Sequence, residues 1–337
     1  MTPAARGPAL NQRVRDIRPV PMRMARLDAA YARLLGPLSL SAARAPSMMS
    51  LLEKRVLFGL ARDVYSGAGI ICDAGTFLGA STVCFGEGLR RNPAAATIRA
   101  RWPRPIVAFE RGLINPGMPA FFQRHRITGM GDLGESFVPA LERTIAGVAD
   151  AVDLRIGDIQ ITAAGDDTPI EILFLDVLKL PEISAFAVQN LFPRLIPGVS
   201  IVVQQDYFYD MLPYIKTDQE FFAAHFDYIG EACSSALFRC RAAITPDAIA
   251  TWQAGIPPRQ QERLAGIAMQ RSVDPARRFM MGLSKVRLLC GLYGGDVGRD
   301  YLRHLLRDFP DQATTTQARL HEAIAGARQA CDEDPAG

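Results

Sequence analysis

The sequence predicts an α/β protein built on a doubly wound, Rossmann-like sheet that is mostly parallel, with an antiparallel hairpin at its edge. Three observations predict it. Short, almost wholly apolar runs alternate with longer segments of helical periodicity. Several of these runs end in an acidic residue, and a Gly-rich turn follows the first run. Apolar residues on both faces of a strand indicate a sheet covered by helices on both sides, as parallel sheets are.

The chain divides into three predicted parts. Residues 1–66 form an N-terminal helical leader or lid, with a loose segment over 1–22 and helices over 23–35 and 47–66. Residues 67–245 form the α/β core, which would bind a cofactor. Residues 246–337 form a helical extension, in which Thr245-Pro246 and Asp274-Pro275 are typical of helix starts. We expect this extension to be a helical subdomain or a homodimer surface.

The core begins with the stretch 68–81, AGIICDAGTFLGAS, which reads as strand, turn and helix. Asp73 ends the apolar run, and Gly75 and Gly79 would let the backbone approach a ligand closely. Ser81 and Thr82 could cap the following helix or contact the ligand. The G-x-x-x-G spacing is not the G-x-G-x-x-G fingerprint of dinucleotide binding. The alternative cofactor is S-adenosylmethionine (SAM), whose ammonium group an acid at this position would bind; a plain tight turn is the other interpretation.

Two further acids follow predicted strands. The strand over 105–110 ends in Glu110, a position from which a carboxylate accepts hydrogen bonds from ribose hydroxyls. The strand over 152–156 is followed by Asp158, which could accept from the adenine amino group. Three acids at three successive strand ends are less probable by chance than any one alone, so they favour a nucleoside ligand at this edge.

The remaining elements continue the alternation. The clearest strand covers 170–176; a helix over 182–195, a strand over 200–204, a helix over 217–225 and a strand pair over 226–232 and 236–244 follow it. The connections over 91–104 and 115–134 read as polar or irregular. Helices are predicted over 246–255, 258–271, 275–290, 296–308 and 313–331.

The composition excludes several classes of protein. Hydrophobic residues make up 49% and charged residues 22% of the 337, which is typical of a globular protein. The net charge is +3 and the basic residues are scattered, so we expect no nucleic-acid partner. No apolar run approaches the ~20 residues of a membrane span, and we see no signal peptide. The six cysteines form no C-x-x-C pair, which predicts reduced thiols in a cytoplasmic protein without zinc.

Taken in order, the motifs over residues 50–245 resemble the class I SAM-dependent methyltransferases. The motifs are DAGTFLGAST, an acid after the second strand, GD after the third, IEILFLDVLK and LFPRLIPGVSIVVQQDY. The closer likeness is to the small-molecule O-methyltransferases of the macrocin and catechol types. The resemblance implies a seven-stranded sheet whose last strand is antiparallel. It also implies SAM as cofactor and a small-molecule acceptor, such as a secondary metabolite or a sugar.

The resemblance also implies a metal site. In that family an aspartate after the fourth strand and an acid–amide pair after the fifth hold Mg²⁺, and in the catechol enzymes a lysine three residues after the first aspartate is the general base. Here Asp176 and Lys179 have that spacing, and Gln205 and Asp206 occupy the pair, with a neutral Gln205 as the departure. Either these side chains hold Mg²⁺, or Asp176 and Asp206 orient the acceptor by hydrogen bonds.

Two tyrosines and one compositional feature complete the prediction. Tyr207 and Tyr209 directly follow the acidic pair and could line the acceptor pocket. The chain contains only four lysines, Lys54, Lys179, Lys216 and Lys285, among 38 basic residues, so a lysine at the D-x-x-K position is suggestive. An alternative activity on the same fold is cyclisation or elimination at the aminobutyryl arm of SAM. An oxidoreductase using NAD and a non-catalytic partner subunit are the remaining alternatives.

Overall fold

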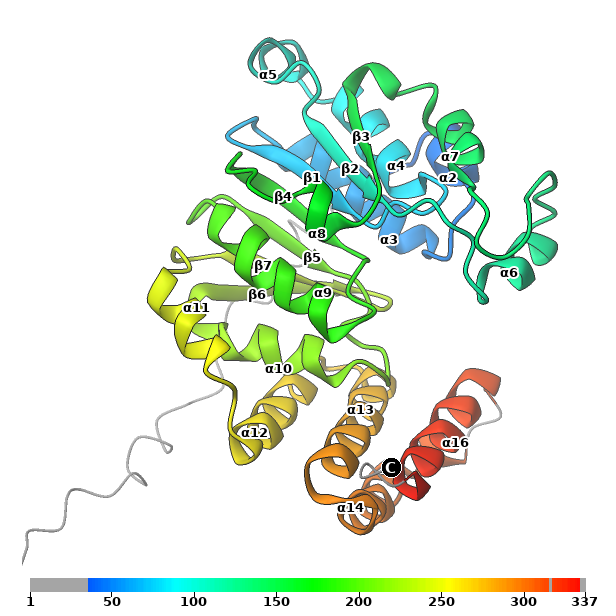
Figure 1. Ribbon diagram of the computed structural model, residues 1–337, viewed down its shortest axis with the longest axis vertical. Helices are drawn as coiled ribbons and strands as arrows, with labels where there is room; N and C mark the ends of the chain where they lie inside the picture. Colours follow the sequence, from blue (N-terminus) through cyan, green and yellow to red (C-terminus); the bar gives the residue numbers. More distant parts are fainter. Residues whose placement is uncertain (1–35, 315–316, 334–337) are drawn as a thin grey trace, which may run out of the picture.

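A computed structural model describes residues 36–314 and 317–333 of the chain; the predicted helix over 23–35 and the leader before it lie outside the described residues. Seven strands form one sheet in the order β3-β2-β1-β4-β5-β7-β6 (Figure 1). Their bounds are β1 Ile70–Ala74, β2 Ile106–Glu110, β3 Val152–Ile156, β4 Ile170–Leu175, β5 Ile201–Gln204, β6 Phe226–Ala232 and β7 Ser235–Cys240.

The pairing confirms the predicted sheet. The strands from β3 to β5 pair in parallel, whereas β7 pairs antiparallel with both β5 and β6. A two-residue turn at Cys233 and Ser234 joins β6 to β7, with Cys233 at φ 50°. A turn this short can only join antiparallel neighbours. The sheet is therefore the seven-stranded, mostly parallel one that the resemblance implies.

Helices cover both faces of the sheet, because its side chains alternate between two buried clusters. Ile71 of β1 belongs to the cluster beneath the N-terminal helices, while Cys72 belongs to the cluster on the opposite face. The helices of the N-terminal half are α2 Leu40–Arg44, α3 Leu51–Gly59, α4 Ala80–Arg90, α5 Ala95–Arg101, α6 Met118–Arg124, α7 Val138–Ile145 and α8 Ile159–Thr162. The predicted helix over 47–66 begins later than expected, at the capping box of Ser50 and Glu53. A π-helical turn, Leu60–Val64, continues α3 at its other end.

Two connections that the sequence predicts to be irregular contain helices. The connection over 91–104 contains α5, whose buried Ile98 packs in the core, and the stretch over 115–134 contains α6, which buries Phe121 and Phe122. The irregular stretch predicted over 115–134 is wrong because few of the α6 residues are apolar and charged residues flank them. Phe121 and Phe122 pack against Phe77 of the Gly-rich turn, which is distant in sequence.

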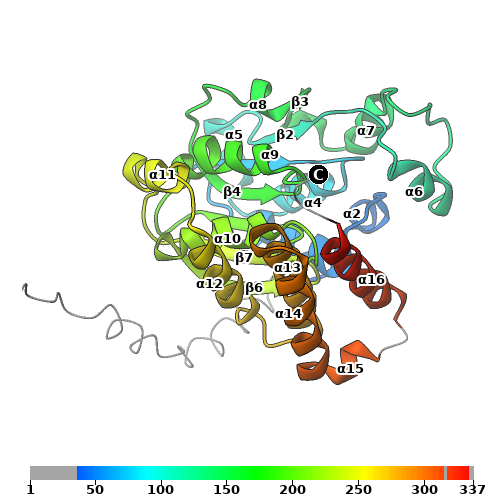
Figure 2. The ribbon, with the colours of Figure 1, turned by 60° about the horizontal axis from the view of Figure 1, so that its bottom comes forward.

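The second half of the chain contains α9 Pro181–Phe186, α10 Pro213–Phe221, α11 Pro246–Gln253, α12 Pro258–Met269, α13 Pro275–Tyr293, α14 Gly295–Asp308, α15 Pro310–Ala313 and α16 Ala318–Asp332. Helix α10 begins four residues before the predicted start, at Pro213. Helices α13, α14 and α16 share a separate core around Phe279, Leu302 and Ile324. Figure 2 shows α12 and α13 beside α10, whereas α16 lies on the other side of α13. Within the described residues, no helix combines the length and apolarity that a membrane crossing requires.

Candidate active site at the carboxyl edge of the sheet

The parallel ladder places the predicted site residues in one row. The Gly157 N–H donates to the Glu110 carbonyl at 2.9 Å, and the Gly75 N–H donates to the Phe109 carbonyl at 3.0 Å. The Asp176 N–H donates to the Ala74 carbonyl at 2.8 Å, and the Gln205 N–H to the Leu175 carbonyl at 3.0 Å. These backbone bonds fix the order of the ends of β3, β2, β1, β4 and β5 along one edge, where open α/β sheets bind ligands.

Asp73 lies inside the sheet rather than at the strand end, because β1 extends to Ala74. Its side chain is fully buried, and its Oδ2 accepts hydrogen bonds from the hydroxyls of Ser81 at 2.9 Å and Thr82 at 2.6 Å. Its Oδ1 is buried and has no hydrogen-bond partner. Burial raises the pKa of Asp73 to about 6, against the effect of the hydroxyl donors. An unsatisfied buried carboxylate oxygen fits a cationic ligand group, such as the SAM ammonium.

The two glycines of the turn are required by the chain's own packing. Gly75 has φ 97°, and a Cβ there would lie 2.9 Å from the backbone carbonyl carbon of Asp176. Gly79 has φ 88°, and a Cβ would lie 2.5 Å from the Ile145 side chain on α7. Ser81 lies within α4 and does not cap it, since Gly79 is the N-cap residue and makes no side-chain capping bond. These internal contacts are sufficient to require glycine at both positions, and the expected capping role of Ser81 is not observed.

Glu110 fastens the turn to the edge of the sheet. Its Oε2 accepts the Phe77 N–H at 2.6 Å and its Oε1 accepts the Gly112 N–H at 3.0 Å, with Phe77 held at φ 50°. Burial raises the pKa of Glu110, although these backbone donors oppose the change. Each carboxylate oxygen can still accept one more hydrogen bond, which leaves room for two ribose hydroxyls. Asp158 is exposed and caps α8 through the Gln160 N–H at 2.9 Å.

Asp176, Lys179 and Asp206 meet at the other end of the row. The Lys179 ammonium donates to Asp176 Oδ1 at 2.7 Å and also to Asp206 Oδ2. Burial and the Asp206 carboxylate raise the pKa of Asp176 to about 7, against the lowering effect of Lys179. Burial lowers the pKa of Lys179, but the two carboxylates outweigh it and raise that pKa above its usual value. The lysine is therefore protonated at neutral pH in this arrangement.

Gln205 turns away from this cluster. Its Nε2 donates to Ser234 Oγ at 2.9 Å and its Oε1 accepts from Ser235 Oγ. The Ser234 hydroxyl donates to Glu53 Oε1 of α3 at 3.0 Å. Ser235 Oγ also lies 3.0 Å from Glu53 Oε1, so its single proton is shared between that oxygen and Gln205 Oε1. In the segments 36–314 and 317–333, no three His, Cys, Asp or Glu side chains are grouped so that they could hold a metal ion. The residues of the predicted Mg²⁺ site do not fit that ion, because the third ligand serves a different network.

The loop after β5 carries Asp206, with φ 59°, and is held from two sides. From α10, the buried Lys216 ammonium donates to the carbonyls of Met211 at 2.6 Å and Leu212 at 3.2 Å. From α13, Arg287 donates to Asp210 at 3.2 Å. Burial lowers the pKa of Lys216 to about 7. The C-terminal extension thus shapes the loop that presents Asp206.

The two tyrosines of this loop do not face the cluster together. Tyr207 is fully buried, and its hydroxyl donates to Glu220 at 2.7 Å in the core beneath α10. Its predicted place in the acceptor pocket is wrong in this structure, because the ring packs against Phe208 and Phe238. Tyr209 is half-buried and lies under the Arg319 guanidinium of α16, 5.9 Å from the ring centroid. It remains near the acceptor side, at the border with the C-terminal helices.

Sequence reasoning missed the roles of Glu53, Lys216 and Ser235. The scarcity of lysine was a usable signal, since Lys54 and Lys216 are both buried and their ammonium groups bind backbone carbonyls. A compact ammonium fits such a cage of carbonyls, whereas the planar guanidinium of arginine does not. In a chain that otherwise uses arginine, two of the four lysines, Lys54 and Lys216, therefore mark such carbonyl cages.

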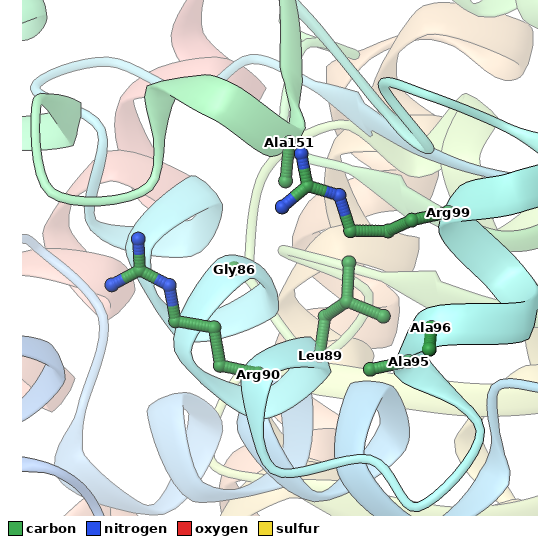
Figure 3. A pocket seen from close by; sticks show the side chains of 7 residues that line it. All are labelled: Gly86, Leu89, Arg90, Ala95, Ala96, Arg99 and Ala151. Carbon is green, nitrogen blue, oxygen red and sulfur yellow. The ribbon is translucent and has the colours of Figure 1, made fainter.

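Figure 3 shows a pocket apart from this row, with Arg90 and Arg99 at its border. It is lined by Gly86, Leu89, Arg90, Ala95, Ala96, Arg99 and Ala151. Both arginines pair with Asp150, at 3.5 and 2.6 Å. None of the predicted site residues lines this pocket.

Comparisons with known proteins give only distant similarity. No protein-family model matches the chain, and no curated protein matches it. Among solved structures, the chain is similar to the O-methyltransferase NovP at 16% identity, over 65% of this chain and 99% of that chain, with a TM-score of 0.43. It is similar to the calicheamicin methyltransferase CalS11 at 15% identity, over 70% and 99%, with a TM-score of 0.36. A third similar structure is a protein from Klebsiella pneumoniae provisionally described as an O-methyltransferase. It is 14% identical, over 69% of this chain and 96% of that chain, with a TM-score of 0.34. Similarity at this level leaves the function to be inferred from the side chains at the sheet edge.

Proposed function

We propose that the protein is a SAM-dependent methyltransferase that methylates a hydroxyl group of a small molecule. One observation carries this proposal. The row of strand ends brings two acids suited to a nucleoside with a cationic arm, Asp73 and Glu110, next to a charged cluster suited to an acceptor. In-line transfer requires donor and acceptor to be held side by side, which such a row allows.

The cofactor half of the proposed site uses acids that the chain satisfies only with neutral donors. SAM, when bound, supplies a methyl group activated on a positively charged sulfur. Asp73 Oδ1 would accept from the ammonium of its amino-acid arm, and Glu110 would accept from its ribose hydroxyls. Asp158 is exposed at the next strand end and would face the adenine. Within residues 36–314 and 317–333 no cationic side chain pairs with Asp73 or Glu110, so both can attract a cationic or hydroxyl-bearing ligand.

The acceptor half of the proposed site removes one proton from the acceptor hydroxyl. The acceptor hydroxyl must lose its proton as its oxygen bonds to the methyl carbon, and the electron pair of the broken carbon–sulfur bond stays on sulfur. A base with a pKa near the working pH performs this best. The pKa of Asp176 is about 7, whereas Lys179 is protonated, so the proposal assigns the proton to Asp176 rather than to the lysine.

The alternative proposal is a second reaction of the same cofactor. Cyclisation or elimination at the aminobutyryl arm needs no acceptor and no metal, and the orientation of Gln205 away from Asp176 and Asp206 favours it. In that reaction the product is methylthioadenosine rather than S-adenosylhomocysteine.

Calorimetric titration with S-adenosylhomocysteine tests the cofactor class, and product analysis after incubation with SAM and hydroxylated small molecules tests the reaction. Micromolar binding with S-adenosylhomocysteine as product supports methyl transfer. Binding with methylthioadenosine as product supports the second reaction instead. Absence of binding at millimolar ligand would remove both.

A further inference from the structure

The Lys179 side chain occupies the position between two carboxylates where the resemblance places a divalent cation. Its ammonium nitrogen lies 2.7 Å from Asp176 Oδ1 and also bonds Asp206 Oδ2. The two carboxylates come from different strand ends and are partly exposed, at 27% and 20%. Two carboxylates this close repel each other unless a cation lies between them. The chain supplies that cation itself.

Gln205, the third ligand that the resemblance implies, is committed elsewhere. It is 8% exposed, and both ends of its amide are used by the hydroxyls of Ser234 and Ser235. Those hydroxyls are in turn bonded to Glu53, which caps α3 through the Ser50 N–H at 2.8 Å. To ligate an ion beside Asp206, Gln205 would have to leave a buried and paired network. Such a rearrangement leaves several polar groups unsatisfied, which costs free energy.

Charge and geometry also oppose a metal. Two carboxylates and one ammonium carry a net charge of −1, whereas Mg²⁺ requires six oxygen ligands in a near-octahedral arrangement. Only the two aspartates are left to offer side-chain oxygens from the predicted set. An ion placed between Asp176 Oδ1 and Asp206 Oδ2 would have to displace the ammonium that already bonds both oxygens.

We propose that the Lys179 ammonium is the resident cation of this site and takes the place of the divalent metal. The proposal rests on the proposed function only in treating this edge as the acceptor side. An ammonium has three N–H groups, and two are used by the aspartates. The third is available to one acceptor oxygen. A metal chelates two neighbouring oxygens, so the proposal assigns this site to acceptors with a single reacting hydroxyl rather than to those that require a chelating pair.

Paramagnetic resonance with Mn²⁺ as the probe tests the proposal on the full-length chain. We expect the wild type to show no specific site, and Lys179→Met to bind Mn²⁺ at least about 10-fold more tightly, because it frees two adjacent carboxylates. The matched control is Lys285→Met, which removes a lysine 4.0 Å from Glu262 on a distant helix pair and should not change Mn²⁺ binding. Thermal unfolding monitored by circular dichroism establishes that each variant is folded.

Stoichiometric Mn²⁺ binding to the wild type, lost in Asp206→Asn, would overturn the proposal. So would a folded Lys179→Met protein that binds no better than the wild type, because the ammonium would then not occupy the cation position. The Mn²⁺ titration of the wild type needs no variant, so it tests the proposal even if Lys179→Met fails to fold. These readouts require neither SAM nor turnover. A failure to bind S-adenosylhomocysteine would therefore reject the proposed function and leave this result readable.

Discussion

The two ends of the ligand-facing row satisfy their acids in opposite ways. At the β1–β2 end, Asp73 and Glu110 receive only neutral donors, namely two hydroxyls and two backbone amides. At the β4–β5 end, Asp176 and Asp206 share a full positive charge from Lys179. Neutral donors hold a carboxylate in place without cancelling its charge, whereas one ammonium between two carboxylates cancels half of their charge and leaves −1. The first arrangement retains the stronger attraction for a cationic ligand, and the second combines a weaker negative charge with an N–H donor for an acceptor oxygen.

The largest effect on turnover is expected from removing the Lys179 ammonium. Lys179→Met should reduce turnover roughly 100-fold, the scale for losing one preorganised donor at a reacting oxygen. The affinity for S-adenosylhomocysteine should change little, because the lysine lies at the acceptor end. Steady-state kinetics and calorimetry measure the two quantities, and Lys179→Arg, which keeps the charge, should lose less. Unchanged turnover in Lys179→Met would remove the lysine from the mechanism.

The complementary variant acts at the cofactor end. Glu110→Ala should weaken S-adenosylhomocysteine binding about 30-fold, or ~2 kcal/mol, the scale of a charged hydrogen bond. It also frees the Phe77 amide that Glu110 holds at 2.6 Å. Glu87→Ala is the control, since that glutamate pairs with Arg91 on the surface of α4. An unchanged affinity for S-adenosylhomocysteine in Glu110→Ala would show that Glu110 does not bind the cofactor, and the two ends of the row would then not differ in this way.

The pH profile should distinguish the two ends by which acid controls the rate. The pKa of Asp176 is raised to about 7, so below that pH the carboxylate carries a proton and cannot accept another. We expect kcat/KM to rise about tenfold per pH unit below 7 and to level above it. Asp176→Asn should abolish this limb along with most activity. A profile that is flat from pH 5 to 8 in the wild type would exclude Asp176 as the base.

The smallest effect concerns stability at the cofactor end. The folded-state pKa of Asp73, about 6, exceeds its ordinary value of 3.8, so the folded state binds the extra proton between these values. Stability associated with Asp73 is therefore fully present below about pH 4 and lost as pH rises through about 6. Thr82→Val removes a hydroxyl 2.6 Å from the carboxylate and should destabilise the protein by ~1 kcal/mol more at pH 8 than at pH 5.

Urea unfolding at the two pH values checks this last prediction. Thr251→Val is the control, because its hydroxyl bonds only a carbonyl on the surface of α11. An equal loss of stability at both pH values would show that Asp73 does not titrate between them.

Much of the fold was predictable because it depends on local pattern. The strand over 152–156 coincides with β3, and every other predicted strand overlaps an observed one, since apolar runs and turn residues are read within a few positions. The positions of Asp158 and Asp176 were predictable in the same way, because a residue after a parallel strand lies at the carboxyl edge of the sheet, whereas Asp73 lies within β1. Helices α5 and α6 were missed because few of their residues are apolar, and Ile98, Phe121 and Phe122 are buried by partners distant in sequence.

The sequence by itself determined the order of strands along the chain, the edge of the sheet at which Glu110 and Asp176 lie, and the D-x-x-K spacing. Only the tertiary structure decided where their neighbours point. It buried Tyr207 against Phe238, turned Gln205 toward Ser235, and brought Glu53 to that serine across 182 positions. The physical reason is that a side chain's direction is set by the groups that bury and satisfy it, and those groups come from distant parts of the chain.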